Sequence, residues 1–178
     1  MKKYFLISAF GKDKVGIVAS LSKVLYENGF NLEDSSMSKL GGEFTVMLVV
    51  STDKNISEGE VSKLFDEVKK NLGLQIYVKE LKEEEAKKEK PKEDSIYRIV
   101  VYGADKPGIV YKTTKLLADK NVSILDMTTE KSGDLYILLT EVALPEGLSF
   151  NELKSQIKGL QDEIGVDISC EKIESVEL

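Results

Sequence analysis

Apolar residues recur in the same order in two halves of the chain. Short runs rich in β-branched and aromatic residues, at 4–10 and 96–102, each end at a glycine and predict strands. Apolar residues at helical spacing follow each run, namely Ile17, Leu21, Val24 and Leu25 in the first half and, less completely, Ile109, Leu116 and Leu117 in the second. Each half is therefore predicted to begin with a strand and a helix.

The middle of each half has the pattern of a β-hairpin. Residues 30–40 and 42–50 form two strand-like runs that meet at Gly41-Gly42, and residues 122–131 and 134–142 meet around Ser132-Gly133. Glycine at the junction suits a tight turn between paired strands. Two hairpins are therefore expected, one in each half.

A second helix is predicted after each hairpin, because a capping box opens an apolar stripe. The boxes are Ser57-x-x-Glu60 and Ser149-x-x-Glu152, in which serine and glutamate satisfy backbone amides at a helix start. The stripes are Val61, Leu64, Phe65, Val68 and Leu72 in one helix, and Leu153, Ile157, Leu160 and Ile164 in the other. Glycine follows both stripes, and residues 74–81 and 166–173 supply a last strand.

The two halves are copies of one unit. GKDKVGIV at 11–18 and GADKPGIV at 103–110 share six of eight residues, and a shift of 92 aligns 4–86 with 96–178 without a gap. Turn, cap and core positions coincide throughout, which is the signature of internal duplication. We call these two stretches the first and second octets.

The predicted order of elements in each unit is βαββαβ. This order packs two helices on one face of a four-stranded antiparallel sheet, a ferredoxin-like α+β unit. Between the units, every residue of 82–94 except Ala86 and Pro91 is charged, which is typical of a solvated linker. Pairs such as Glu83 with Lys87 favour a short helix there, before Pro91 stops it. We therefore predict domains at 1–81 and 95–178, joined by the linker 82–94.

Composition narrows the classes of function. The 178 residues have a net charge of −6, which argues against direct binding of nucleic acid or anionic membranes. No apolar run is long enough to span a bilayer. The chain has no histidine and one cysteine, Cys170, so neither a metal cluster nor a disulfide is expected, and a cytoplasmic location is the simplest expectation.

Ferredoxin-like units serve several unrelated functions, so particular residues must discriminate among them. An RNA-binding unit would carry aromatic residues on a basic third strand, where this chain has only Phe44. A metallochaperone would need a Cys-x-x-Cys pair, which is absent. An acylphosphatase-like enzyme would need an arginine in the first loop, but the sole arginine, Arg98, falls within a predicted strand.

The octets and the helices after them resemble the start of ACT domains, whose usual pattern is Asp, a variable residue, Pro, Gly and Ile, then a helix and a strand beginning near Asn-Ile. The resemblance covers both halves, and the tandem arrangement resembles the glycine cleavage system transcriptional repressor family and related free-standing amino-acid-binding proteins. It implies that domains pair side by side and bind amino acids between partners. Two positions depart from the pattern: Val15 replaces the proline that Pro107 retains, and Ser123 stands where Asn31 stands in the first half.

The candidate ligand-binding residues follow from the octets and from this resemblance. Free amides at the start of a helix favour a carboxylate, and glycine lets a ligand approach the backbone or supplies a special backbone angle. The alternative is that the octets are only tight turns. Lys12, Lys14 and Lys106 are expected to be solvated. The candidates are Gly11, Asp13, Val15, Gly16, Ile17 and Asn31 in the first half, and Gly103, Asp105, Gly108, Ile109 and Ser123 in the second.

The resulting hypothesis is a regulatory protein, not an enzyme, that senses a small amino acid without a metal or other cofactor. We expect a homodimer, because exposed sheet edges need a partner, and regulation through another protein. The alternative is a scaffold of ACT-like domains that binds proteins without a ligand.

Overall fold

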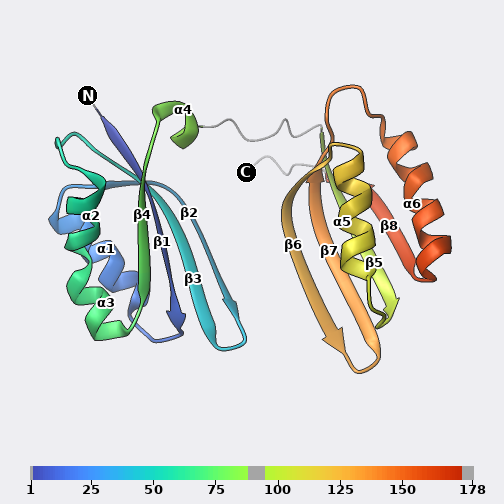
Figure 1. The fold of residues 1–178 in the computed structure, drawn as a ribbon, viewed down its shortest axis with the longest axis horizontal. Helices are drawn as coiled ribbons and strands as arrows, with labels where there is room; N and C mark the ends of the chain where they lie inside the picture. The colour runs from blue at the N-terminus through green and yellow to red at the C-terminus, as the bar shows by residue number, and fades with distance from the viewer. Residues whose placement is uncertain (1, 88–94, 174–178) are drawn as a thin grey trace. The chain divides into compact units, whose positions relative to one another are not determined.

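The computed structural model describes residues 2–87 and 95–173. The chain divides into two compact units, Met1–Glu89 and Lys90–Leu178, and the division falls inside the charged segment 82–94. Each unit is a four-stranded antiparallel sheet, and the helices that follow its first and third strands lie on one face (Figure 1). The prediction of two α+β ferredoxin-like units is confirmed. None of the described helices is long and apolar enough to cross a membrane.

The first unit has the strand order β2-β3-β1-β4, with β1 in the middle of the sheet beside β3. Its elements in chain order are β1 (Lys3–Lys12), α1 (Ile17–Glu27), β2 (Asn31–Leu40), β3 (Glu43–Thr52), α2 (Glu58–Leu64), α3 (Asp66–Leu72), β4 (Gln75–Leu81) and α4 (Glu83–Ala86).

The second unit repeats this topology, with the order β6-β7-β5-β8. Its elements are β5 (Ile96–Ala104), α5 (Ile109–Asp119), β6 (Ser123–Ser132), β7 (Leu135–Ala143), α6 (Phe150–Ile164) and β8 (Asp167–Lys172). The edge strands β2 and β6 carry a register shift at equivalent places, between Leu32 and Asp34 and between Ile124 and Asp126. The duplication seen in the sequence therefore extends to the irregularities of the sheets.

Each core lies between one face of the sheet and the helices. In β1 the side chains of Phe5, Ile7 and Ala9 are buried, while Phe10 on the opposite face is half exposed. Ile17, Leu21 and Leu25 supply the buried stripe of α1. The period of two in the strand and of about 3.6 in the helix is thus the pattern that the sequence predicted.

Both predicted capping boxes are present. Ser57 and Ser149 accept the amides of Glu60 and Glu152, and these glutamates accept the serine amides at 2.9 Å. The helices after the boxes end at glycines in the left-handed conformation, Gly73 in the first unit and Gly165 in the second.

The second helix of the first unit differs from the expectation of one continuous helix. It is divided at Phe65 into α2 and α3, whereas α6 is unbroken. Phe65 is fully buried, and its amide donates to the carbonyl of Ser62, three residues back. Lys69 Nζ also donates to the Ser62 carbonyl at 2.9 Å, so this carbonyl has a hydrogen-bond donor where the helix is interrupted.

The described part of the linker begins as a short helix, as predicted. It forms α4, and Lys87 pairs with Glu83 at 2.6 Å. The second predicted pair, Glu84 with Lys88, lies outside the described residues.

Candidate functional site

The two octets form the loops that join β1 to α1 and β5 to α5, and their geometry is nearly identical. Gly16 and Gly108 are the N-caps, with φ of 95° and 96° and no side-chain cap. The first amides to donate into the helices are those of Ser20 and Lys112, which bond to the cap carbonyls at 2.9 Å. Helix geometry therefore leaves the amides of the first turn without an intrahelical acceptor, which is what a bound carboxylate requires.

The glycines at the caps are explained by their backbone conformation. A residue with a side chain is strained at these positive φ angles, although a Cβ at either position would meet no atom within 4 Å. Of the two explanations considered for Gly16, the special backbone angle therefore applies. The space beside the cap is open as well, so a ligand is not excluded by crowding.

The glycines that end the strands serve packing. A Cβ at Gly11 would lie 3.0 Å from the Leu74 side chain, and a Cβ at Gly103 would lie 3.0 Å from that of Val166. The side chains of Ile17 and Ile109 are buried in the cores. These four candidates shape the loops through packing. Among them, Ile17 and Ile109 offer a ligand their backbone amides at the start of the helix.

The octet aspartates tie the loops to the hairpins and do not cap the helices. Asp13 pairs with Lys39 at the end of β2, and Asp105 pairs with Lys131 at 2.5 Å at the same place in β6. The Asp13 amide also donates to the carbonyl of Gly42 at 3.0 Å. These lysines were not among the residues predicted from the sequence, although their spacing of 92 residues was a signal that could have found them.

Two octet lysines are not simply solvated, contrary to the expectation. Lys14 Nζ donates to the Leu72 carbonyl at 2.9 Å, and Lys106 Nζ donates to the carbonyl of Gly165 at 3.3 Å. Both ammonium groups therefore lie at helix C-termini, where the helix dipole favours a cation. The proline position itself is exposed in both octets, as Val15 and as Pro107.

Within one domain, Asn31 lies far from the octet. β2 runs in the same direction as β1, because β3 is antiparallel to both. Ser51 is the partner of both Asn31 and Tyr4, and Gly11 lies seven positions beyond Tyr4 along β1. At about 3.3 Å per residue this separates Asn31 from the octet by roughly 23 Å.

The second domain has the same separation. Ser123 and Ile96 are both paired with Ala143, and Gly103 lies seven positions beyond Ile96 along β5. One ligand cannot therefore contact an octet and the start of the next strand within a single domain, and a second domain would have to supply one of the two.

Asn31 instead belongs to a polar cluster around Glu33. The Glu33 carboxylate accepts hydrogen bonds from Ser51 Oγ at 2.5 Å, Lys2 Nζ at 2.9 Å and Asn31 Nδ2 at 3.2 Å. These bonds, that of Ser51 foremost, lower the pKa of Glu33 to about 2. Since Asn31 donates through its nitrogen, its side-chain oxygen is still able to accept a further hydrogen bond.

Groups capable of catalysis are sparse in the described residues. Burial raises the pKa of the half-buried Cys170 to about 11, which keeps the thiol protonated and unreactive. Arg98 lies within β5 and is paired with Glu141 at 3.1 Å and Glu171 at 3.6 Å. Across residues 2–87 and 95–173, no group of three possible acidic, cysteine or histidine ligands could hold a metal ion.

Comparison with curated sequences finds single-domain relatives. A UPF0237 protein of Neisseria meningitidis serogroup A is 42% identical over 72 residues, which are 40% of this chain and 80% of that protein. A UPF0237 protein of Methanococcus maripaludis is 38% identical over 74 residues, 41% of this chain and 82% of that protein. Each match has the length of one of the two domains.

Comparison with solved structures finds the tandem arrangement. The crystal structure of an unknown protein from Galdieria sulphuraria is 28% identical with a TM-score of 0.80, and the match covers 98% of this chain and 100% of that one. A candidate glycine cleavage system transcriptional repressor has a TM-score of 0.78 at 18% identity, with 98% and 99% covered. At that identity the second likeness shows a shared fold.

The sequence profile described as "ACT domain" matches the chain twice, at residues 3–79 and 96–171. These ranges contain both octets and all eight strands of the two sheets, apart from the last residues of β4 and β8. The chain belongs to the ACT domain family.

Proposed function

We propose that this protein is a regulatory protein that binds a small amino acid at an interface between ACT domains. Occupancy of the interface is relayed through association with a second copy or with a partner protein. The observation that carries the proposal is the duplicated octet, in which a left-handed glycine precedes helix amides with no intrahelical acceptor.

The ligand carboxylate is assigned to the octet amides. Helix N-termini favour anions through both their free N–H groups and the helix dipole. Lys14 and Asp13 hold the first octet from two sides, on the C-terminus of α3 and on β2. A loop fixed in this way binds a ligand with little loss of conformational entropy.

A second copy would bring Asn31 to the octet. β2 is an edge strand whose residues are all exposed, so one of its edges is open to pairing. If two β2 strands pair antiparallel about a two-fold axis, the start of one lies beside the end of the other. The end of β2 carries Lys39, which is paired with Asp13 of the octet. Asn31 of the second copy would therefore lie near the octet of the first.

The two domains are expected to bind unequally. Val15 has an amide that Pro107 lacks, so the first octet offers one more donor. Asn31 carries both a donor and an acceptor, whereas Ser123 has only a hydroxyl. The first domain is therefore assigned the tighter site.

Regulation is assigned to protein contacts and not to DNA binding by this chain. The net charge of −6 opposes contact with phosphates, and a repressor role like that named for the structural neighbour would need another protein. Catalysis is not proposed, because the described residues offer no activated nucleophile.

A thermal-shift screen against the amino acids tests the function, since a ligand that binds only the folded state raises the melting temperature. The matched variants Val15→Pro and Pro107→Val then test the site by calorimetry. The N-cap glycines of the two octets have the same φ, so we expect proline at position 15 to fit as Pro107 does in the second octet. We expect Val15→Pro to weaken binding and Pro107→Val to strengthen it; the absence of any ligand in the screen would overturn the proposal.

The second candidate is a scaffold that pairs proteins through its edge strands without a ligand. The fully exposed β2 favours it. A stable dimer by light scattering, combined with no thermal shift from any amino acid, would support the scaffold and exclude the sensor.

A further inference from the structure

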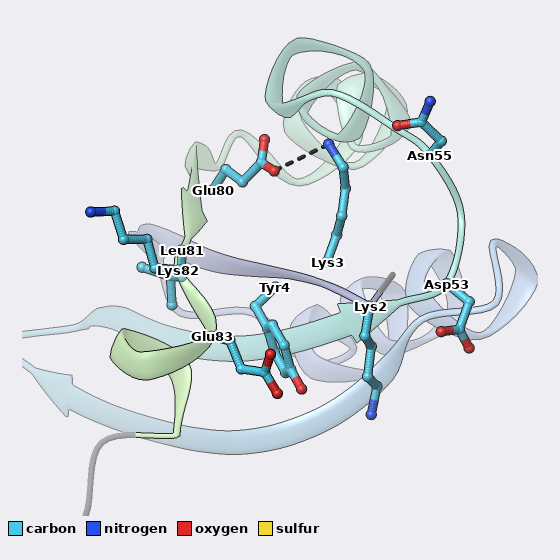
Figure 2. Close-up of a pocket in the computed structure, with 9 residues that line it drawn as sticks. All are labelled: Lys2, Lys3, Tyr4, Asp53, Asn55, Glu80, Leu81, Lys82 and Glu83. Carbon is cyan, nitrogen blue, oxygen red and sulfur yellow. Dashed lines mark ion pairs between the residues drawn. The ribbon is translucent and has the colours of Figure 1, made fainter.

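A pocket of about 610 Å³ lies in the first domain at the end opposite the octet. The start of β1, the loop between β3 and α2, the end of β4 and the start of α4 surround it (Figure 2). Small-molecule sites occupy roughly 300–1,000 Å³, so the pocket has the size of one. It shares no residue with the octet.

The centre of the pocket is held by residues that already have partners. Lys3 Nζ donates to the carbonyl of Ile56 at 3.0 Å and pairs with Glu80 at 3.1 Å, and Figure 2 shows this pair spanning one side. Tyr4, the next residue of β1, is almost completely buried. These contacts fix the walls without a ligand.

Three polar groups on the rim have no hydrogen-bond or ion-pair partner in the described part of the chain. They are the carboxylate of Asp53, the amide of Asn55 and the ammonium of Lys82. Asp53 interacts electrostatically with Lys2, which also lines the pocket and pairs with Glu33. Asp53 and Asn55 lie on one side of the pocket, where their side chains point away from each other, and Lys82 lies on the other side (Figure 2). A ligand that matches them must offer a cation to Asp53 and an anion to Lys82.

The second domain serves as an internal comparison. At the positions of Lys3, Tyr4, Asp53 and Asn55 it has Ser95, Ile96, Pro145 and Gly147. The two domains have the same strand order, so the fold does not require the polar residues of this pocket. Their presence in the first domain alone calls for another explanation.

We propose that this pocket binds a small zwitterion, with its ammonium at Asp53 and its carboxylate at Lys82. β3 and β4 flank β1 on either side, so the two halves of the site are separated by roughly 10 Å of sheet. The long, exposed side chain of Lys82 can shorten this span by rotating over the pocket. The ligand is therefore an amino acid whose two charges are separated by several bonds, or a short peptide of the same chemistry.

Binding of a ligand in this pocket affects α4, the short helix at the beginning of the linker. Lys82 is the residue before α4, and its carbonyl accepts the amides of Glu85 and Ala86 at 3.0 Å. The pair of Lys87 with Glu83 is exposed, and the Lys87 ammonium lies 5.8 Å from the centre of the buried Tyr4 ring. A ligand that bridges Lys82 to the sheet opposes fraying of α4.

The test is an NMR titration of the full chain with three ω-amino acids of increasing length: glycine, 4-aminobutyrate and 6-aminohexanoate. Butylamine and butyrate are the single-charge controls. We expect one of the longer zwitterions to shift the amides of Asp53, Asn55 and Lys82 and to bind at least tenfold more tightly than either control. The same ligand should slow hydrogen exchange at Glu85 and Ala86.

Two variants identify the contacts. Asp53→Asn and Lys82→Gln should each weaken binding roughly tenfold, whereas Glu84→Gln, an exposed charge on α4 outside the pocket, should leave it unchanged. Equal binding of zwitterions and single-charge controls, or unchanged binding in both variants, would overturn the proposal. So would shifts confined to the octet, a result that leaves the proposed amino-acid sensor intact.

Discussion

The two domains share the octet devices and differ at the opposite end of their sheets. Both octets have a left-handed glycine, an aspartate paired with a hairpin lysine and a lysine on a helix C-terminus. At the other end, the positions of Glu33 and Ser51 in the first domain are Leu125 and Ala143 in the second. Duplication has thus preserved the loop and its supports while the far end of the sheet has diverged.

The exposed sheet faces differ too. Arg98 pairs with Glu141 and Glu171 across three neighbouring strands of the second sheet. The equivalent positions in the first sheet are Leu6, Val49 and Lys79. Two units with one fold therefore share the octets and the capping boxes, and differ in the polar groups at the far end of the sheet and on its exposed face.

The largest expected effect tests whether the domains are independent. Phe65→Ala removes a fully buried ring at the break between α2 and α3, which should cost about 3–5 kcal/mol. Ile157→Ala is the matched variant in the unbroken α6. Amide exchange measured in each domain should accelerate only in the domain that carries the change. Acceleration in both domains would show that they unfold as one unit.

The next effect should be equal in the two domains. Gly16→Ala and Gly108→Ala force a side chain into the left-handed conformation, which should cost about 1–2 kcal/mol each. Gly159→Ala, within α6 at an ordinary backbone angle, should instead stabilise by about 0.5–1 kcal/mol. Denaturant titration measures all three. If the octet variants lose ligand without losing stability, the glycines serve ligand approach and not the backbone angle.

The elements of both domains that depend on local sequence pattern could be predicted from the sequence. Strands, hairpins and capping boxes follow from period, turn residues and caps, so the fold could be derived from residues such as Ser57 and Gly73. The break at Phe65 could not, because the stripe from Val61 to Leu72 has a continuous helical period.

The site was predicted less completely than the fold. The octets could be found by their repetition, but the partners of Asp13 and Lys14 lie 26 and 58 residues away and depend on the folded hairpin and helix. Asn31 was grouped with the octet by resemblance, although strand direction puts the two at opposite ends of the domain. The separation between Asn31 and the octet becomes visible only when the directions of β1 and β2 in the sheet are known.

A smaller effect tests whether the domains bind ligand unequally. Asn31→Ala should weaken binding about tenfold, or about 1.4 kcal/mol, because one hydrogen-bonding side chain is lost. Ser123→Ala should change binding less, since its hydroxyl offers fewer bonds. Calorimetry compares them, with Asn71→Ala, an exposed residue of α3, as the control. Equal losses at positions 31 and 123 would show two equivalent sites.

The smallest effect is a pH dependence confined to the first domain. The pKa of Glu33 is lowered in the folded state to about 2 from an ordinary value of 4.5, first by Ser51 and then by Lys2 and Asn31. A lowered pKa means that the carboxylate stabilises the fold above pH 4.5, and that this contribution is lost as the pH falls toward 2. Because the carboxylate is exposed, the change should be modest.

The second domain has Leu125 at this position, whereas the capping-box glutamates, Glu60 and Glu152, have lowered pKa values in both domains and cancel in the comparison. Glu33→Gln should therefore make the acid sensitivity of the first domain, followed by amide exchange between pH 5 and 2, shallower and closer to that of the second. An unchanged profile in Glu33→Gln would mean that the cluster around Glu33 contributes nothing to the difference between the domains.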